Sequence, residues 1–379
     1  MSYLSFISFV DKSVSNRCVG GGGEFLDDFE DVAREIASLS QARKDAAAVL
    51  LAGGVPESLR FDFLEAGLSL PVPSAPFSGR VLAVDGGIVA EEFHSVDLFC
   101  WRACAAVFDY SAGRLSKCSY YPSPLPKTRF QARHSLQSHE FNWAKSLLRL
   151  ESEITCAAEA CRKHEPQVVL LDGSIVPQVG DKPSRDSQAF ALYERALDSF
   201  ACLFEECEAR GVVLAGVIKD SRGRHFLDLL LAHCPQLAPF AGALGSSSDS
   251  AFLSSLLQVG RRTPAFKYAS NASETSVLKD LGEWGHSVAS FYLRPAEFDR
   301  PLRVDFLSRA SSSPERVAGV VGFLSGINRS YGYPAVLIEA DLRAAMRPEE
   351  LDHFHARLQA KLGFSAEFLA LRRNSRPFR

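Results

Sequence analysis

Three short apolar runs alternate with long helical segments, and this alternation constrains the fold more than any other feature of the chain. The runs are Arg80–Val84, Val168–Leu171 and Val212–Ile218, each with the length and composition of a buried strand. Helices are expected over about 133–164, where apolar residues recur at i, i+3 and i+4, and over about 187–210. The order strand, helix, strand, helix, strand predicts an α/β fold with some parallel pairing.

Further elements are expected on both sides of this centre. Residues 96–108 are rich in β-branched and aromatic side chains and predict more sheet, whereas three prolines predict a loop over 121–129. A helix is expected over 25–51, because its acids come early and Arg43 and Lys44 come late. The C-terminal third predicts short strands over 288–293 and 302–306, and helices near 314–327 and 349–362.

The overall charge is close to neutral, since 42 lysines and arginines against 45 acids give 42 − 45 = −3 over 379 residues. A chain that is 46% hydrophobic and 23% charged has an ordinary globular composition, which excludes a disordered or collagen-like protein. The net charge argues against a uniformly basic surface. It does not exclude nucleic acid as a partner, because one local groove is enough to hold phosphates. The dense basic run is the tail, Leu371–Arg379.

Nine cysteines are spread along the chain with no Cys-x-x-Cys pair, which indicates small core residues rather than a zinc site. The N-terminal residues show no basic region followed by a long apolar stretch, so no signal peptide is expected. No run approaches about 18 apolar residues, the length that a membrane span needs. We therefore expect a cytoplasmic protein that does not enter a membrane.

Two of the apolar runs end in an acid followed by glycine. Asp85 begins the sequence Asp-Gly-Gly after the first run, and Asp172 begins Asp-Gly-Ser after the second. In an open α/β sheet, the carboxyl ends of parallel strands meet at the usual ligand-binding edge. Carboxylates there suit Mg²⁺ or Mn²⁺, and two such ions stabilise both oxygens in phosphodiester cleavage. Asp-Gly is also a common structural turn, so the pattern indicates a metal-dependent hydrolase without excluding a purely structural role.

An ordered set of short motifs resembles the NurA nuclease family over roughly residues 80 to 345. No single motif is specific, but their order and approximate separations agree with the family as a set. The motifs are Val84–Gly87, Leu170–Ile175, Gly216–Ser221, Gly332–Pro334 and Ile338–Ala340.

The resemblance implies an RNase H-like mixed sheet flanked by helices over 80–345. It leaves a helical N-terminal extension over 1–79 and a C-terminal helix with the basic tail over 346–379. It implies single-stranded endonuclease and 5′–3′ exonuclease activity that depends on Mn²⁺, with Mg²⁺ as a substitute and two ions bound. It also implies a homodimer that binds single-stranded DNA and duplex ends. The implied partner is a HerA-type hexameric ATPase, a DNA translocase, in end resection, double-strand break repair or defence.

The resemblance also assigns the acids of the site. Asp85 matches the family's first catalytic acid, and Asp172 matches the acid of the Asp-Gly-Ser motif. The family's helical glutamate precedes that motif, and either Glu151 or Glu153 could fill its place. Both flank the apolar stripe of the helix, so the helical wheel does not decide between them. Glu153 is preferred, because Glu-Ile followed by small residues is closer to the family pattern.

Three further positions complete the expected site. Lys219 resembles the lysine that ends the third strand of the family and would hold the scissile phosphate as a point charge. Tyr333, before a proline, would position a phosphate or a water by its hydroxyl. The chain departs from the family eight residues later, where Asp341 stands in place of a histidine. Aspartate still ligates divalent cations, so the expected metal ligands are Asp85, Glu153, Asp172 and Asp341.

Two other functions remain open from the sequence. Asp341 is compatible with a catalytically weak DNA-binding scaffold subunit of a translocase complex, since it cannot act as a general acid near neutral pH as histidine can. A nucleotide-binding protein of the actin and sugar-kinase type also places Asp-Gly at a strand end. Such a protein needs a second glycine-rich segment, for which Gly242–Gly245 is a poor substitute.

Overall fold

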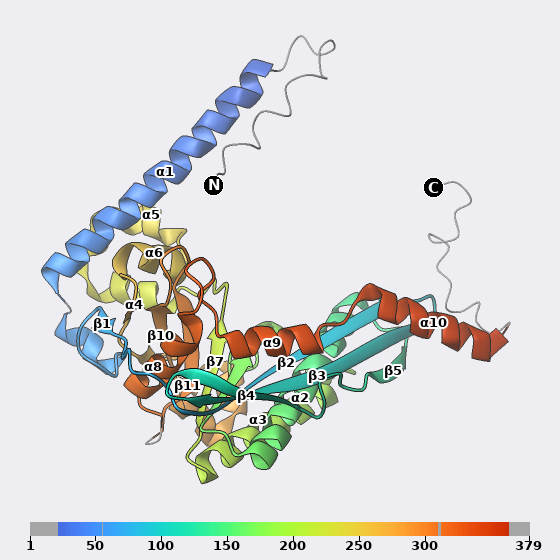
Figure 1. Cartoon of the computed structure of the whole chain (residues 1–379). Helices are drawn as coiled ribbons and strands as arrows, with labels where there is room; N and C mark the ends of the chain where they lie inside the picture. The colour runs from blue at the N-terminus through green and yellow to red at the C-terminus, as the bar shows by residue number, and fades with distance from the viewer. Residues whose placement is uncertain (1–21, 55, 310–311, 364–379) are drawn as a thin grey trace, which may run out of the picture.

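A single mixed sheet organises the part of the chain that the computed structural model describes, residues 22–54, 56–309 and 312–363 (Figure 1). The order of its hydrogen-bonded strands is β1-β8-β10-β11-β7-β6-β2-β3-β4, with β5 also on β3 and β9 also on β10. Its strands are β1 Leu70–Pro71, β2 Gly79–Glu92, β3 Val96–Ser111, β4 Arg114–Tyr121, β5 Arg129–His134, β6 Val168–Asp172, β7 Val213–Ile218, β8 Arg261–Arg262, β9 Phe266–Lys267, β10 Val288–Arg294 and β11 Leu302–Leu307.

Helices cover both faces of this sheet. The α-helices are α1 Gly22–Gly53, α2 Ser138–His164, α3 Phe190–Ala209, α4 His225–His233, α5 Ala241–Gly245, α6 Asp249–Leu256, α7 Ser276–Asp280, α8 Pro314–Ser325, α9 Ala335–Ala344 and α10 Pro348–Leu362. Short 3₁₀ turns lie at Glu57–Phe61, Val179–Asp181, Pro235–Phe240 and Gly282–Ser287. None of the helices in these described segments is long and apolar enough to cross a membrane.

The central five strands have the RNase H-like arrangement. β2, β3 and β4 form an antiparallel meander, β6 lies parallel to β2 on its other side, and β7 lies parallel to β6. Each parallel connection passes through a long helix, α2 before β6 and α3 before β7. The α/β fold with parallel pairing that the sequence predicts is therefore confirmed, as is the RNase H-like sheet flanked by helices.

The alternation of side chains along β2 decides which residues can reach which helices. Leu82 and Val84 pack with α2 and α3, whereas Val81 and Ala83 pack with α8 and α9 on the opposite face. Figure 1 shows these layers, with α9 on one side of β2 and β3 and α2 on the other. Because successive side chains point to opposite faces, Asp85 belongs to the α9 face.

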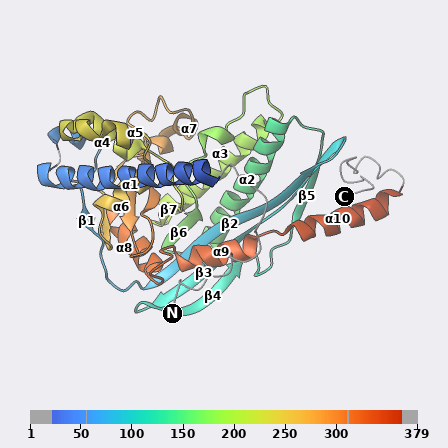
Figure 2. The same cartoon turned by 90° about the horizontal axis from the view of Figure 1, so that it is seen from above.

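Two expectations about element boundaries are wrong. Asp85 does not end its strand: β2 continues to Glu92 in an antiparallel pairing with β3, and Figure 2 shows this hairpin reaching toward α10. Only the parallel pairing with β6 stops there, after Val84 and Leu171. The helix expected from 133 begins at Ser138 instead, because residues up to His134 belong to β5 and pair with β3.

A second cluster of helices lies beside the sheet. α4, α5, α6 and the C-terminal half of α1 share one apolar core, and the rest of α1 projects away from it (Figure 1). Sequence periodicity missed α4 to α7 because each has fewer than ten residues. The segment Gly242–Gly245 lies in the five-residue helix α5.

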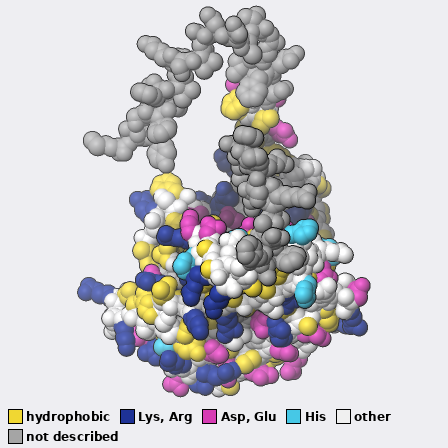
Figure 3. Space-filling model, turned by 90° about the vertical axis from the view of Figure 1, so that its right-hand side faces the viewer, with side chains coloured by type: hydrophobic (Ala, Val, Ile, Leu, Met, Phe, Trp, Pro, Cys, Tyr) yellow, Lys and Arg dark blue, Asp and Glu magenta, His cyan; other side chains and the backbone are white. Residues whose placement is uncertain are grey.

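The remaining sequence-based expectations concern surface charge and cysteines. Basic and acidic side chains are interspersed on the described part of the face in Figure 3, in keeping with the small net charge. The eight cysteines in the described segments are all free, and six of them are buried. The basic tail, Leu371–Arg379, lies outside the described residues.

Candidate active site

The turn after β6 presents Asp172 at the carboxyl edge of the parallel strands. Gly173 has φ of +124°, a conformation that favours glycine, and its N–H donates to the carbonyl oxygen of Val217 at 3.1 Å. The turn passes so close to β7 that a Cβ on Gly216 would lie 2.2 Å from the carbonyl oxygen of Gly173. Gly173 in the turn after β6 and Gly216 on β7 therefore fix the position from which the Asp172 carboxylate projects.

Lys219 and Tyr333 both contact this carboxylate. Lys219 Nζ donates to Asp172 Oδ2 at 2.9 Å, and the Tyr333 hydroxyl donates to Oδ1 at 2.8 Å. The ammonium also lies 4.4 Å from the centroid of the tyrosine ring, within the range of a cation–π contact. Three residues from separate parts of the chain, on β6, after β7 and before α9, thus meet at one point.

Both partners of Asp172 keep their protons near neutral pH. Burial lowers the pKa of Lys219, but the hydrogen bond and charge of Asp172 outweigh it, so the pKa is raised overall. Burial raises the pKa of Tyr333 well above its usual range, and the Asp172 charge raises it further. Near neutral pH the Asp172 carboxylate is therefore contacted by a charged ammonium group and by a protonated hydroxyl group.

Asp85 lies beside Asp172, at the point where the parallel pairing of β2 and β6 ends. It is 6% exposed, and its Oδ1 accepts the N–H of Gly86 at 2.7 Å. Burial raises the pKa of Asp85 to about 7, and the charges of Asp172 and Asp341 add to the rise, while the Gly86 N–H lowers it. Such a carboxyl group is poorly compensated by the protein around it.

The structure distinguishes the two candidate glutamates on α2. Glu153 is 3% exposed, and burial together with the charge of Asp85 raises its pKa well above the usual range, although Arg149 lowers it. It reaches β2 because Gly86 has no side chain: a Cβ there would lie 3.4 Å from that of Glu153. Glu151 instead accepts two hydrogen bonds from Arg195 on α3, at 3.0 and 3.1 Å.

Asp341 occupies the rim of this acidic cluster. It lies on α9, is exposed, and interacts with the Asp85 carboxyl group. The structure thus brings together all six residues that the sequence singled out: Asp85, Glu153, Asp172, Lys219, Tyr333 and Asp341.

Sequence reasoning missed a supporting network beneath the Asp172 turn. The Ser174 hydroxyl donates to Asp305 Oδ2 at 2.7 Å, and Ser290 Oγ and Arg303 Nε donate to Oδ1 at 2.6 and 2.7 Å. Asp305 is 1% exposed on β11. The available signal was a lone acid and its neighbouring arginine in the otherwise apolar run Leu302–Leu307. The network anchors the residue that follows the Asp-Gly pair.

The donors of the cluster suit a hard divalent cation, with one reservation about their arrangement. Asp85, Glu153 and Asp172 supply carboxylate oxygens, the ligands that Mg²⁺ and Mn²⁺ prefer, and burial together with neighbouring carboxylates raises the pKa values of the first two. Yet no three His, Cys, Asp or Glu side chains in the described segments are arranged to hold a metal ion as they stand. Both Asp172 oxygens are engaged by Lys219 and Tyr333. A cation would therefore share these oxygens with Lys219 and Tyr333 or replace one of the two contacts.

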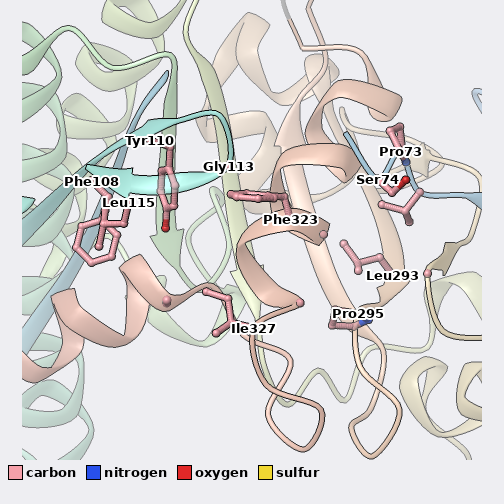
Figure 4. A pocket seen from close by; sticks show the side chains of 15 residues that line it. Pro73, Ser74, Phe108, Tyr110, Gly113, Leu115, Leu293, Pro295, Phe323 and Ile327 are labelled. Carbon is pink, nitrogen blue, oxygen red and sulfur yellow. The ribbon is translucent and has the colours of Figure 1, made fainter. Parts of the chain in front are cut away.

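An apolar cavity of about 580 Å³ lies elsewhere, between β3, β4 and the end of α8 (Figure 4). Phe108, Tyr110, Phe323 and Ile327 are among its lining residues, none of which carries a charge. It contains none of the six site residues, and it offers no cation or carboxylate for phosphate chemistry. The acidic cluster is thus the better candidate for an active site.

Comparisons with known proteins agree with this fold. The NurA nuclease from Sulfolobus solfataricus is 15% identical, with a TM-score of 0.58 over 92% of this chain and 99% of that chain. A crystal structure of NurA with manganese is 13% identical (TM-score 0.49, covering 77% and 91%), and another of NurA is 11% identical (TM-score 0.49, covering 89% and 97%). No curated protein matches the sequence. The NurA domain family model matches residues 79–346, more than half of the chain, which therefore belongs to the NurA domain family.

Proposed function

We propose that this protein is a metal-dependent DNA nuclease, a hydrolase of phosphodiester bonds. The observation that carries the proposal is the cluster of buried Asp85 and Glu153 with half-buried Asp172, beside Lys219 and Tyr333. Membership of the NurA domain family supports it, as does the shared fold of the Sulfolobus solfataricus NurA nuclease. Buried carboxyl groups with raised pKa values, next to an acid that pairs with a lysine at a sheet edge, are typical of a catalytic site rather than of a structural turn.

The residues that would hold metal are Asp85, Glu153, Asp172 and Asp341. Bound cations would neutralise these carboxylates and supply a Lewis acid and a reactive hydroxide for attack on phosphorus. A cation also explains why the protein keeps two poorly compensated carboxyl groups in its interior. We propose Mn²⁺ as the preferred ion, with Mg²⁺ as a substitute and two ions in the complete site.

Lys219 and Tyr333 act on the substrate phosphate in this proposal. With Asp172 holding a cation, the Lys219 ammonium would be available to bind a non-bridging phosphate oxygen as a point charge. Tyr333 keeps its proton and can donate a hydrogen bond to the phosphate or to the attacking water. The cation–π contact with the Tyr333 ring would keep the ammonium at the site when Asp172 is bound to a cation.

The finer features of the proposal follow the family resemblance. We propose single-stranded endonuclease and 5′–3′ exonuclease activity on single-stranded DNA and duplex ends, by a cytoplasmic homodimer. Its partner would be a HerA-type hexameric ATPase in end resection, double-strand break repair or defence. The nuclease domain would span 80–345, with 1–79 and 346–379 as elaborations.

The direct test is cleavage of end-labelled single- and double-stranded DNA with Mn²⁺, Mg²⁺ or EDTA. We expect Mn²⁺-dependent cleavage that falls by about a thousandfold or more in Asp172→Ala and Glu153→Gln. Glu151→Gln is the matched control, because it removes a carboxylate from the same helix that pairs with Arg195 instead. Equal activity of the unchanged chain and Asp172→Ala would contradict the proposal.

A catalytically weak DNA-binding scaffold is the second candidate. It is favoured by Asp341 in place of the family histidine, and by the engagement of both Asp172 carboxylate oxygens by Lys219 and Tyr333. DNA binding without cleavage under any metal, even after a HerA-type ATPase is added, would support the scaffold over the nuclease.

A further inference from the structure

A cross-strand pair in the β2–β3 hairpin receives the C-terminal end of α9. Gly87 on β2 lies directly opposite Arg102 on β3. The helix end comes so close that a Cβ on Gly87 would lie 2.1 Å from the carbonyl oxygen of Ala344 and 3.1 Å from the nitrogen of Met346. Only glycine at this position allows α9 to approach β2 so closely.

Arg102 completes this contact with hydrogen bonds. Its Nε donates to the carbonyl oxygen of Ala344 at 3.2 Å, and its Nη2 donates to that of Ala345. The same guanidinium donates to both carboxylate oxygens of Glu350 on α10, at 2.9 and 3.2 Å. The arginine side chain is 9% exposed. A buried cation therefore satisfies carbonyl groups that a helix end leaves without partners, and it opposes the negative end of the helix dipole.

α9 also carries Asp341, about one turn before this end. Its carboxyl group lies close enough to that of Asp85 to share a hydrogen bond with it and to raise its pKa. α9 has only ten residues. A small slide of this helix along its axis would move Asp341 away from the acidic cluster. The contact at Gly87 and Arg102 opposes that slide, because it fixes the helix end to the strand that carries Asp85.

We propose that Arg102, together with Gly87, is a positioning residue that holds α9 in place and thereby keeps Asp341 beside Asp85. The part of this inference that concerns Mn²⁺ affinity rests on the proposed function, because it takes Asp341 as a metal ligand. The fixing of α9 itself is a property of the metal-free protein. Arg102 lies next to carbonyl groups and Glu350, so it acts through the helix and not on the substrate.

Arg80 provides a matched control within the same sheet. It is also an arginine whose guanidinium donates to the C-terminal end of a helix, through the carbonyl oxygen of His164 in α2, and to a carboxylate, that of Asp109. Arg80→Gln thus removes the same kind of interaction without touching α9. A purely structural role for Arg102 predicts that both variants lower the free energy of unfolding while leaving Mn²⁺ affinity unchanged, the more buried Arg102 by the larger amount.

The experiment compares Arg102→Gln, Arg102→Lys and Arg80→Gln in three measurements. Hydrogen exchange of the α9 amides in EDTA reports on the helix without metal or substrate. Calorimetric titration with Mn²⁺ gives metal affinity, and cleavage assays separate kcat from KM. Gly87→Ala displaces the same helix end by a different route, and it carries the test if Arg102→Gln does not fold.

We expect Arg102→Gln to speed exchange in α9 and to weaken Mn²⁺ binding by about tenfold or more, as loss of an outer-shell partner does. Its effect on kcat should exceed that on KM, and Arg102→Lys should recover part of the loss. Arg80→Gln should leave α9 exchange and Mn²⁺ affinity within about twofold. In an Asp341→Ala background, Arg102→Gln should weaken Mn²⁺ binding little further, because coupled residues are not additive.

Two results would overturn this inference without contradicting the proposed nuclease function. The first is hydrogen exchange in α9 that is the same in Arg102→Gln as in the unchanged chain. The second is a loss of Mn²⁺ affinity from Arg102→Gln that is as large in the Asp341→Ala background as in the unchanged chain. Failure of the proposed function looks different. In that case Asp172→Ala binds Mn²⁺ as the unchanged chain does, and the exchange measurement alone then decides whether Arg102 holds α9.

Discussion

Two buried aspartates in one sheet, Asp85 on β2 and Asp305 on β11, are surrounded in opposite ways. Asp305 is 1% exposed and accepts hydrogen bonds from three side chains, two hydroxyls and a guanidinium. Asp85 is 6% exposed, accepts one backbone N–H, and faces other carboxylates. The donors to Asp305 are Ser174, Ser290 and Arg303.

The difference separates a structural acid from one that awaits a ligand. A buried carboxylate is tolerated when fixed donors replace the water that it lost, and Asp305 has such donors in place. Asp85 lacks them, so its burial costs free energy, which a bound cation would offset in the proposed function. Burial alone would therefore misidentify Asp305 as a candidate metal ligand. The number of hydrogen-bond donors around each carboxylate is what distinguishes Asp305 from Asp85.

The largest effect should come from removing the structural acid. Asp305→Ala leaves Arg303, whose side chain is 12% exposed, without its carboxylate, and it frees Ser174. Breaking a buried ion pair from one side costs about 3–5 kcal/mol, so the free energy of unfolding in urea should fall by that amount. A loss below about 1 kcal/mol would show that the network is not a structural anchor.

Removing the charge of Asp85 should have the opposite sign in EDTA. The folded pKa of about 7 lies above the ordinary value of roughly 3.9, so the folded state binds more protons between these pH values. The neutral form of Asp85 therefore adds to the free energy of unfolding below about pH 4, and this contribution is lost as pH rises through 7. Asp85→Asn should therefore stabilise the metal-free protein at pH 8, by on the order of 1–3 kcal/mol, and much less at pH 4.

Urea unfolding of Asp85→Asn at the two pH values measures this stabilisation. Asp305→Asn is the control, because it disturbs an acid that already has fixed donors and should destabilise at both pH values. A destabilised Asp85→Asn at pH 8 would mean that the carboxylate is compensated, and the contrast between the two aspartates would fail.

Metal should supply what Asp85 lacks. At a Mn²⁺ concentration about 100 times the dissociation constant, a ligand that binds only the folded state adds about 2.7 kcal/mol of stability. We expect the thermal midpoint of the unchanged chain to rise with Mn²⁺ and to return with EDTA. The rise should be absent in Asp85→Asn and retained in Glu151→Gln, whose carboxylate pairs with Arg195 in the unchanged chain. An equal rise in both variants would place the metal elsewhere.

The sequence was informative where local pattern decides the structure. The alternation of apolar runs and long amphipathic helices predicted β6, α3 and β7, and Asp172 ends its strand as expected. Asp85 was placed wrongly at a strand end because Asp-Gly-Gly reads as a turn, yet each glycine there makes room for a helix. A local pattern cannot show that α2 or α9 packs over a strand.

The family resemblance placed Lys219 and Tyr333 in one site but did not predict that both contact the Asp172 carboxylate, and the two residues are 114 positions apart along the chain. The choice between Glu151 and Glu153 needed burial, which the helical wheel did not provide. Arg102 and Asp305 were missed because their partners are carbonyls and hydroxyls contributed by distant segments.

The smallest effect concerns Asp341, the exposed member of the cluster. Because it is at the rim, Asp341→Asn should raise the Mn²⁺ concentration for half-maximal cleavage by only about tenfold. Asp341→His restores a ligand that must be neutral to bind metal, with an ordinary pKa near 6.5. The histidine variant should therefore cleave like the unchanged chain at pH 8 and lose a larger share of its activity than the unchanged chain does as pH falls through about 6.5. Leu342→His, one residue along the same helix, is the control and should show no such loss. Matching pH profiles for Asp341→His and the unchanged chain would place residue 341 outside the metal site, leaving Asp85, Glu153 and Asp172 as its acids.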